Sequence, residues 1–99
     1  MDKKIVRKVI ARSNSLCEVC GNLGSELHHV IKGNGKRKQH ERAESIVLLC
    51  MDCHRGTNGI HGKNGSELDL KLKRKLQDDY YNQGYSEDEV RSLMGGKIY

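Results

Sequence analysis

The sequence has few large aromatic side chains, namely four Tyr. Among its 99 residues there is no Trp and no Phe, and hydrophobic residues make up 35%. A chain of this length suggests one domain, and a domain so small buries only a modest fraction of its surface. We therefore expect the fold to depend on a staple, either a metal ion or disulfide bonds, and the four cysteines can supply either.

Long apolar runs are also missing. No stretch approaches the roughly 20 apolar residues that a membrane-spanning helix needs. The N-terminal stretch MDKKIVRKVIARS alternates charged and aliphatic residues, unlike a signal peptide. We therefore expect a cytoplasmic protein with no membrane span. Thiols stay reduced in that compartment, which favours metal binding over disulfides.

Charge of one sign is in excess. The formal net charge is +5, from 18 Lys and Arg against 13 Asp and Glu. This balance favours a polyanionic partner, with nucleic acid first and a membrane surface second. The net charge alone fits a soluble basic protein without such a partner as well as it fits a protein that binds a polyanion.

Hydrophobic periodicity predicts one helix and two strands before the second cysteine pair. Residues 2–12 place aliphatic side chains at helical spacing, whereas 27–31 and 46–49 are short apolar runs typical of strands. The charged, glycine-bearing segment 32–45 between the strands is expected to be a long exposed loop. Loops of this length in compact domains are often functional.

Three more helices are predicted after the strands. The first begins at Met51 and ends within 57–59. The next two open with capping boxes, formed by Ser66 with Asp69 and by Ser86 with Glu89. An apolar stripe recurs every four residues along the second of the three, at Leu68, Leu72, Leu76 and Tyr80. Such a stripe is more typical of intramolecular core than of a dimer seam, although a dimer stays an alternative. We find no internal repeat.

The four cysteines form two pairs with metal-ligand spacing. Cys17-x-x-Cys20 and Cys50-x-x-Cys53 are separated by 29 residues. Each pair offers two thiolates from one tight turn, so together they can close a tetrahedral four-thiolate site. Zinc is the expected structural metal, with iron as an alternative. The other interpretation is four free or disulfide-bonded cysteines. A four-thiolate site has no open position, so any chemistry must come from elsewhere.

Histidines gather around the same segments. His28 and His29 are adjacent on the first predicted strand, where neighbouring side chains point to opposite faces. One ring can therefore hold a metal while the other handles a proton. His54 directly follows the second cysteine pair, and His61 comes seven residues later. Taken singly, each histidine is more often a structural residue.

The pattern CEVC…ELHHV…IVLLCMDCH…IHG resembles the HNH endonucleases, in the subclass with two CxxC pairs. The resemblance covers residues 17–62. The remainder is similar, more weakly, to the C-terminal part of small phage-encoded HNH-like proteins. The resemblance to HNH endonucleases implies a single α+β nuclease domain over residues 1–99, with a core at 14–64 and a helical extension at 65–99. The core would be a ββα-metal finger with a four-cysteine zinc knuckle, flanked by one N-terminal and two C-terminal helices.

The resemblance also implies roles for individual residues. His29 matches the general base that activates the attacking water. His28 matches a ligand of a catalytic divalent ion, and His54 matches a second ligand. Asn58, expected on the same helix face as His54, matches a position that is often a third ligand. His61 would be an alternative ligand or a phosphate contact.

One position departs from the family pattern. Ser45 stands where the family often has an Asn that braces the loop between the strands. We expect Ser45 or a backbone group to brace the loop more weakly, with lower activity as a consequence. The catalytic ion would be Mg²⁺, Mn²⁺, Ni²⁺ or Zn²⁺. Because imidazole suits the transition metals better than Mg²⁺, we do not expect strict Mg²⁺ dependence.

A basic rim is predicted beside the histidines. Contacts to the phosphate backbone are expected from Lys36, Arg37, Lys38, Arg42 and Arg55. A solvated charged loop is the plainer interpretation. The basic run at 71–75 can extend the same track or be an ordinary solvated helix face.

The sequence therefore favours a phage or prophage-encoded, metal-dependent DNA endonuclease with a one-metal mechanism. The first alternative is a zinc-stabilised DNA-binding module without cleavage. The second is an accessory to a phage recombination or packaging complex, which would contact its partner protein through the C-terminal helices.

Overall fold

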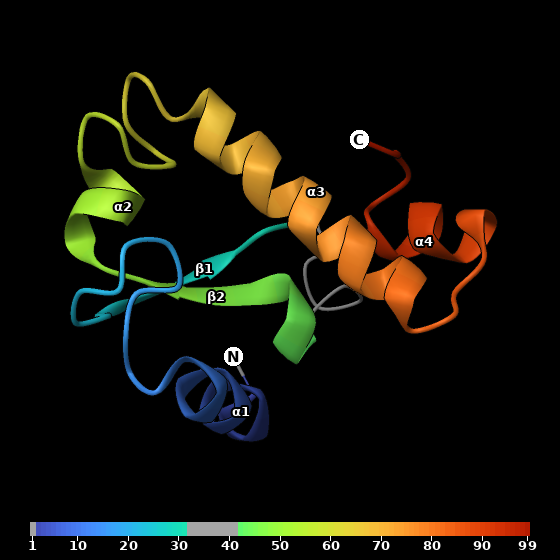
Figure 1. Cartoon of the computed structure of the whole chain (residues 1–99), viewed down its shortest axis with the longest axis horizontal. Coiled ribbons are helices and arrows are strands. Elements are labelled where there is room, and N and C mark those ends of the chain that lie inside the picture. The colour runs from blue at the N-terminus through green and yellow to red at the C-terminus, as the bar shows by residue number, and fades with distance from the viewer. Residues whose placement is uncertain (1, 32–41) are drawn as a thin grey trace.

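The computed structural model describes residues 2–31 and 42–99, and these ranges form an α+β fold (Figure 1). Within them, four α-helices and one 3₁₀ helix surround a two-stranded antiparallel sheet. In chain order the elements are α1 (Lys3–Ser13), β1 (Glu26–His29), the 3₁₀ helix η2 (Ala43–Ser45), β2 (Ile46–Leu49), α2 (Met51–Arg55), α3 (Ser66–Asn82) and α4 (Glu87–Leu93). The predicted helices and strands occur in the predicted order, but η2 was not predicted: it lies in the segment expected to be an exposed loop, and its Ser45 is buried.

Among the described residues, no helix combines the length and the apolar character that crossing a membrane requires.

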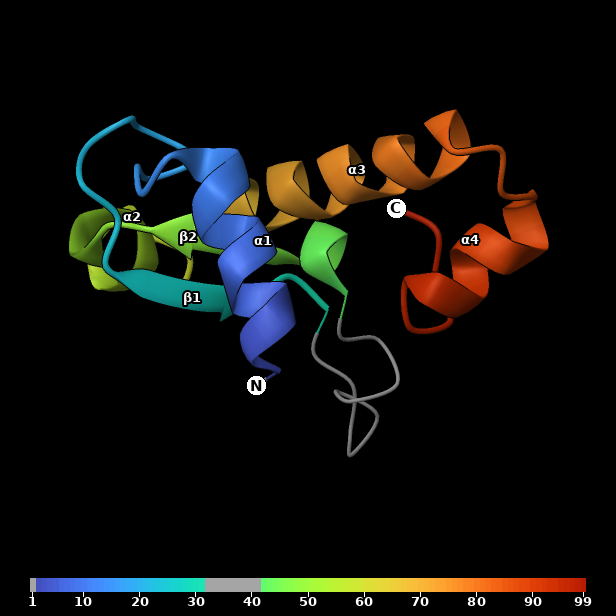
Figure 2. The same ribbon diagram turned by 90° about the horizontal axis from the view of Figure 1, so that it is seen from below.

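The sheet is covered on both faces, with α1 on one side and α3 on the other (Figures 1 and 2). All four residues of β2 are buried, because alternate side chains enter different cores. Ile46 and Leu48 pack against Val9 of α1. Val47 and Leu49 belong instead to the larger core. A strand buried on both faces needs an unbroken apolar run, which explains the sequence IVLL.

Arg12 fastens α1 to the sheet. Its guanidinium donates to the carbonyl oxygens of Ala43 and Ile46, each at 2.7 Å. It also pairs with Glu18, with Nε to Oε1 at 2.8 Å. The Glu18 carboxylate in turn accepts the Leu48 N–H of β2 at 2.8 Å. The segment with the first cysteine pair is thereby held beside the second strand.

The apolar stripe of α3 is intramolecular core, as the sequence favoured. Leu72, Leu76 and Tyr80 are buried, and Leu68 packs against the same core. From α4 and the turn after it, Val90 and Met94 complete this core. Burial raises the pKa of the Tyr80 phenol to about 12, so the side chain stays neutral.

One of the two predicted capping boxes is wrong. The N-cap of α3 is Gly65, and no side chain caps this helix. Asp69 instead accepts a bond from Lys73 at 2.7 Å, one turn further along, and so does not reach back to the helix start. The other box is confirmed, because Ser86 and Glu89 each accept the other's backbone N–H.

Candidate metal centres

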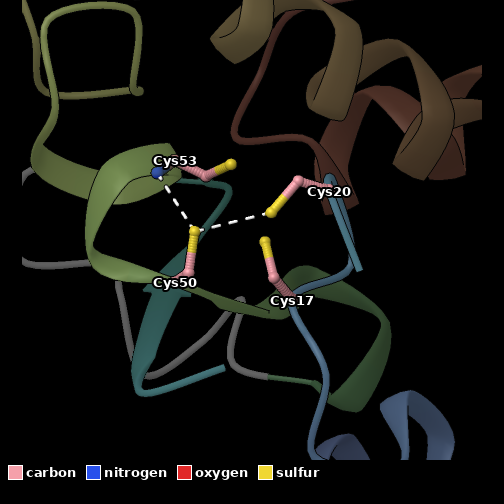
Figure 3. Close-up of side chains that lie close together, drawn as sticks. All are labelled: Cys17, Cys20, Cys50 and Cys53. Carbon is pink, nitrogen blue, oxygen red and sulfur yellow. Dashed lines mark hydrogen bonds between the residues drawn. The ribbon is translucent and has the colours of Figure 1, made fainter. Parts of the chain in front are cut away.

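The four cysteines converge on one point (Figure 3). Their Sγ atoms all lie within 4.8 Å of one another. One pair comes from the turn after α1, and the other from the start of α2. Cys50 is the N-cap of α2, where its Sγ accepts the Cys53 N–H at 3.4 Å. Local turn geometry therefore presents each pair, and the packing of α1 and β2 brings the pairs together.

This cysteine cluster fits a tetrahedral metal ion. Ligands at the usual Zn–S distance of about 2.3 Å would lie about 3.8 Å apart in a tetrahedron. The Sγ atoms of Cys20 and Cys50 are 3.6 Å apart, far beyond a disulfide bond, and all four cysteines are free thiols. Four converging thiolates are the donor set that structural zinc prefers. The cluster can therefore hold a zinc ion.

The thiols of this cluster differ in how readily they ionise. Burial acts to raise the pKa of Cys17, but hydrogen bonds from backbone N–H groups, Cys20 and Cys50 foremost, outweigh it and lower the pKa to about 6. Burial and its thiol neighbours raise the pKa of Cys53. Since a bound cation favours the thiolate at every ligand, a metal ion here would bring all four thiols to the ionised form.

Three histidines form a second cluster. The ring nitrogens of His28, His54 and His61 offer ligand atoms that all lie within 4.8 Å of one another. Their ring centroids are 4.7 to 5.3 Å apart. The three come from β1, from α2 and from the segment after α2. His28 is buried, His54 is half-buried and His61 is exposed, so the cluster reaches from the core to the surface.

A glycine coil brings His61 to His54. Glycine occurs at every third position over residues 56–65, and successive glycines are joined by hydrogen bonds from N–H to O of 2.9 to 3.1 Å. The same coil lets the His61 N–H donate to the His54 carbonyl at 2.9 Å. A Cβ on Gly62 would overlap the carbonyl oxygen of Gly56. Sequence analysis found no repeat, and this spacing is the signal that it missed.

Asn58 does not lie on the helix face of His54, contrary to our expectation. α2 ends at Arg55 with Gly56 as its C-cap, because the glycine coil begins there. Asn58 is exposed, and its amide oxygen accepts a bond from Asn64 at 3.1 Å. The third residue beside His28 and His54 is therefore His61.

Glu26 is a site residue that sequence analysis missed. It stands two residues before His28 on β1, hence on the same face. Its carboxylate accepts hydrogen bonds from His54 Nδ1 at 2.8 Å and from Arg55 Nε at 2.9 Å. The Arg55 guanidinium makes a second contact with the same carboxylate. A carboxylate that accepts a hydrogen bond from Nδ1 requires the proton of the ring to be on Nδ1. The lone pair of Nε2 is then available to bind a metal ion. The i, i+2 spacing from His28 was the available signal.

The ion pair keeps Glu26 charged. The guanidinium of Arg55, followed by the ring of His54, holds the pKa of the Glu26 carboxyl below its usual value of 4.5. Arg55 was predicted to contact nucleic acid. Its side chain is 60% exposed but is paired with this carboxylate.

His29 lies on the opposite face of β1 from the histidine cluster. It faces Ile46 in the strand register, and Ile46 packs against α1. Its neighbour His28 faces Val47, which belongs to the other core. The expected division of the two imidazoles between the faces of the sheet is therefore present, with His29 half-buried at the last position of the strand.

The basic rim is only partly within the described residues. Lys36, Arg37 and Lys38 lie outside them. Arg42 is half-buried and donates to the Tyr85 hydroxyl at 3.1 Å, with its guanidinium 5.9 Å from the centre of that ring. It therefore fastens η2 to the turn before α4 and is not presented to solvent as a free cation.

Ser45 bonds to residues on both sides of the segment between the strands, while the weaker bracing and lower activity that we expect from it stay predictions. Its hydroxyl donates to the Arg42 carbonyl and accepts the Arg42 N–H, both at 3.0 Å. Its own carbonyl accepts the Val30 N–H at 2.9 Å. The two sides of the segment are thus joined through a buried serine.

Comparison of the chain with protein-family models, with curated proteins and with solved structures gives no match.

Proposed function

We propose that the protein is a metal-dependent DNA endonuclease of the HNH type, with β1, β2 and α2 as its ββα-metal unit. The observation that carries this proposal is the cluster of His28, His54 and His61, which has a further histidine next in the chain to His28. The basic character of the chain supports a polyanionic substrate.

The donor set indicates which ion the histidine cluster would take. Three imidazoles suit Zn²⁺, Ni²⁺ or Mn²⁺ better than Mg²⁺, which prefers oxygen ligands. Three protein ligands also leave coordination positions for a phosphate oxygen or water, in contrast to the four thiolates of the cysteine cluster. The carboxylate of Glu26 supports the assignment, since metal-binding histidines usually donate their other N–H to such a group.

In the proposed reaction, His28, His54 and His61 would hold an ion that would supply Lewis-acid stabilisation of charge on the phosphate and the leaving oxygen. His29 takes a proton from the attacking water, whose oxygen forms the new bond to phosphorus. The bond from phosphorus to the leaving oxygen then breaks, and that oxygen takes a proton from solvent water. Glu26 holds the ring of His54 in one tautomer throughout. A phosphodiester plus water thus becomes a phosphomonoester and a hydroxyl.

The test is nicking of a supercoiled plasmid by purified protein with Mg²⁺, Mn²⁺, Ni²⁺ or Zn²⁺, or with none added. We expect cleavage that needs an added ion and is fastest with a transition metal. His29→Ala should retain metal at both clusters and lose at least 100-fold in rate, in the range of a general base. His61→Ala should lose the ion of the histidine cluster and keep the structural zinc.

A second candidate is a zinc-stabilised DNA-binding module without cleavage. The position of His29 favours it, because the opposite faces of β1 separate this ring from the three-histidine cluster. Salt-dependent DNA binding by folded, zinc-loaded protein, with no cleavage under any added ion, would select this candidate. Partner docking through the α3 stripe is disfavoured, since Leu72 and Leu76 are buried inside the chain.

A further inference from the structure

The charge excess of this chain is concentrated on α1 among the described residues. Residues 2–13 contain five basic side chains and one acidic one, whereas residues 66–99 contain six basic and seven acidic. Arg12 is occupied by Glu18 and the sheet edge. The other four cations of α1 are exposed and form no ion pair with any residue in 2–31 or 42–99, namely Lys3, Lys4, Arg7 and Lys8.

These four cations oppose the stability of their own helix. Lys3 and Lys4 stand in the first turn of α1, where the helix dipole favours negative charge, and the only acidic residue at this end is the N-cap Asp2, whose carboxylate accepts the Lys4 N–H at 2.7 Å. Lys3 with Arg7, and Lys4 with Lys8, are like charges four residues apart, an arrangement that repels. Local electrostatics alone would not select this sequence.

The C-terminal helices show the opposite arrangement. Acidic residues occupy the first turns of both α3 and α4. Their basic residues are largely paired one turn away with Asp or Glu, through the ion pairs Asp69–Lys73, Asp79–Lys75 and Glu87–Arg91. Departures from local rules in an otherwise consistent fold tend to mark functional surfaces. Among the described α-helices, only α1 has basic residues and no acidic residue in its first turn.

The placement of α1 relates this surface to the site. Val9 of α1 packs on Ile46, the residue that faces His29 across the sheet. At 100° per residue the four cations lie on the side of α1 away from Val9 and hence face solvent. Figure 2 shows α1 crossing the sheet on this side. α1 therefore covers the face of the sheet that carries His29, and a polyanion on the exposed side of α1 would lie above that face with the helix between them.

We infer that the exposed face of α1, formed by Lys3, Lys4, Arg7 and Lys8, binds the phosphate backbone of duplex DNA. Negative phosphates relieve both the repulsion among these side chains and their conflict with the helix dipole. The contacts are to backbone and carry no sequence information. This inference rests on the proposed function only for its choice of nucleic acid as the polyanion, and it does not require cleavage.

The test compares two double variants that remove the same charges in the same spacing. Lys4→Gln/Arg7→Gln changes the α1 face, and Lys71→Gln/Arg74→Gln changes exposed residues of α3 as the matched control. Each lowers the net charge from +5 to +3. Binding of zinc-loaded protein to a 20-base-pair duplex is followed by fluorescence anisotropy from about 50 to 200 mM NaCl, the range over which phosphate contacts dominate, with no other divalent ion added.

We expect the α1 variant to lower the magnitude of the slope of log K against log salt by about 1.8, that is, about 0.9 for each of two phosphates. The α3 variant should leave the slope within about 0.5 of the wild-type value. Lys3→Gln/Lys8→Gln should repeat the α1 result. Circular dichroism and zinc content should be unchanged in all three variants, because every substituted side chain is exposed.

Equal loss of slope in the α1 and α3 variants would overturn the assignment, because net charge alone would then explain binding. The assignment would also be overturned if wild-type protein did not bind the duplex, whether or not it bound vesicles containing phosphatidylserine. Binding through α1 without any cleavage would contradict the proposed nuclease and leave this surface standing. DNA cleavage by protein whose DNA binding is unchanged by Lys4→Gln/Arg7→Gln would support the proposed nuclease and contradict the assignment of the α1 surface.

Discussion

The two candidate metal centres of this chain are assembled in different ways. The cysteine cluster takes its ligands in pairs from two tight turns. The histidine cluster takes one ligand from each of three segments. Four thiolates would saturate a metal ion and leave it inert, whereas three neutral imidazoles leave it positively charged and open. One chain thus holds a donor set suited to folding and another suited to chemistry.

The dependence of the two clusters on the fold also differs. Each cysteine pair is preformed by its own turn, so only two pieces must meet. The histidine cluster needs the strand, the helix and the glycine coil in place at once. We therefore expect the histidine cluster to be lost whenever the cysteine cluster is lost, but not the converse.

The largest effect should follow from Cys20→Ser. This thiol is exposed, so its removal costs little packing and acts mainly through the metal. Structural zinc contributes about 10 kcal/mol or more to the folding of small zinc domains. The variant should lose its bound zinc, its cooperative thermal unfolding and both clusters together. Metal analysis with circular dichroism measures this, and a stable metal-free variant would contradict the structural role.

Gly62→Ala should break the histidine cluster alone. The added Cβ would overlap the Gly56 carbonyl oxygen, so the coil must open and His61 must leave His54. We expect one zinc per chain to remain, with ion binding at the histidine cluster weakened by at least 100-fold, as for loss of a ligand. Competition titration with Ni²⁺ measures the affinity. The matched control is Lys63→Ala, an exposed neighbour that should behave as wild type.

Glu26→Gln should weaken the same cluster without dismantling it. The amide can still contact His54, but it no longer fixes the proton on Nδ1 or balances Arg55. Loss of such a supporting carboxylate usually costs 10-fold to 100-fold in metal affinity, so we expect a decrease of about that size. The cysteine cluster should be unaffected. Unchanged Ni²⁺ affinity in a folded variant would show that Glu26 serves only as a partner for Arg55.

The smallest effect concerns pH. Because the pKa of Glu26 is lowered below 4.5, its contribution is fully present above that pH and is lost only as pH falls through the lowered value. Above about pH 5.5 the Glu26 carboxyl is fully ionised, so its own titration should not change the factor by which Glu26→Gln lowers metal affinity. Curves of log affinity against pH for wild type and Glu26→Gln should converge only at lower pH, as Glu26 takes up its proton, and curves that converge near pH 6 would contradict this.

Much of the fold could be predicted because the determining interactions are local. The strand Ile46–Leu49, the start of α2 and the Ser86–Glu89 cap follow from apolar runs and short spacings. The N-cap of α3 was predicted wrongly, because serine is by local propensity at least as good an N-cap as glycine. The preceding coil makes Gly65 the N-cap instead. Local propensity could not reveal that competition, because the coil is held by bonds between residues seven apart.

The sequence by itself determined the cysteine cluster and the presence of two histidines on opposite faces of one strand. CxxC spacing and strand alternation are rules of short range, and tertiary structure cannot easily override them. Only the tertiary structure decided that His61 rather than Asn58 joins His28 and His54, and that Glu26 holds one of these rings. The physical reason is that a glycine coil and the approach of α2 to β1 bring together groups whose separation in sequence carries no geometric information.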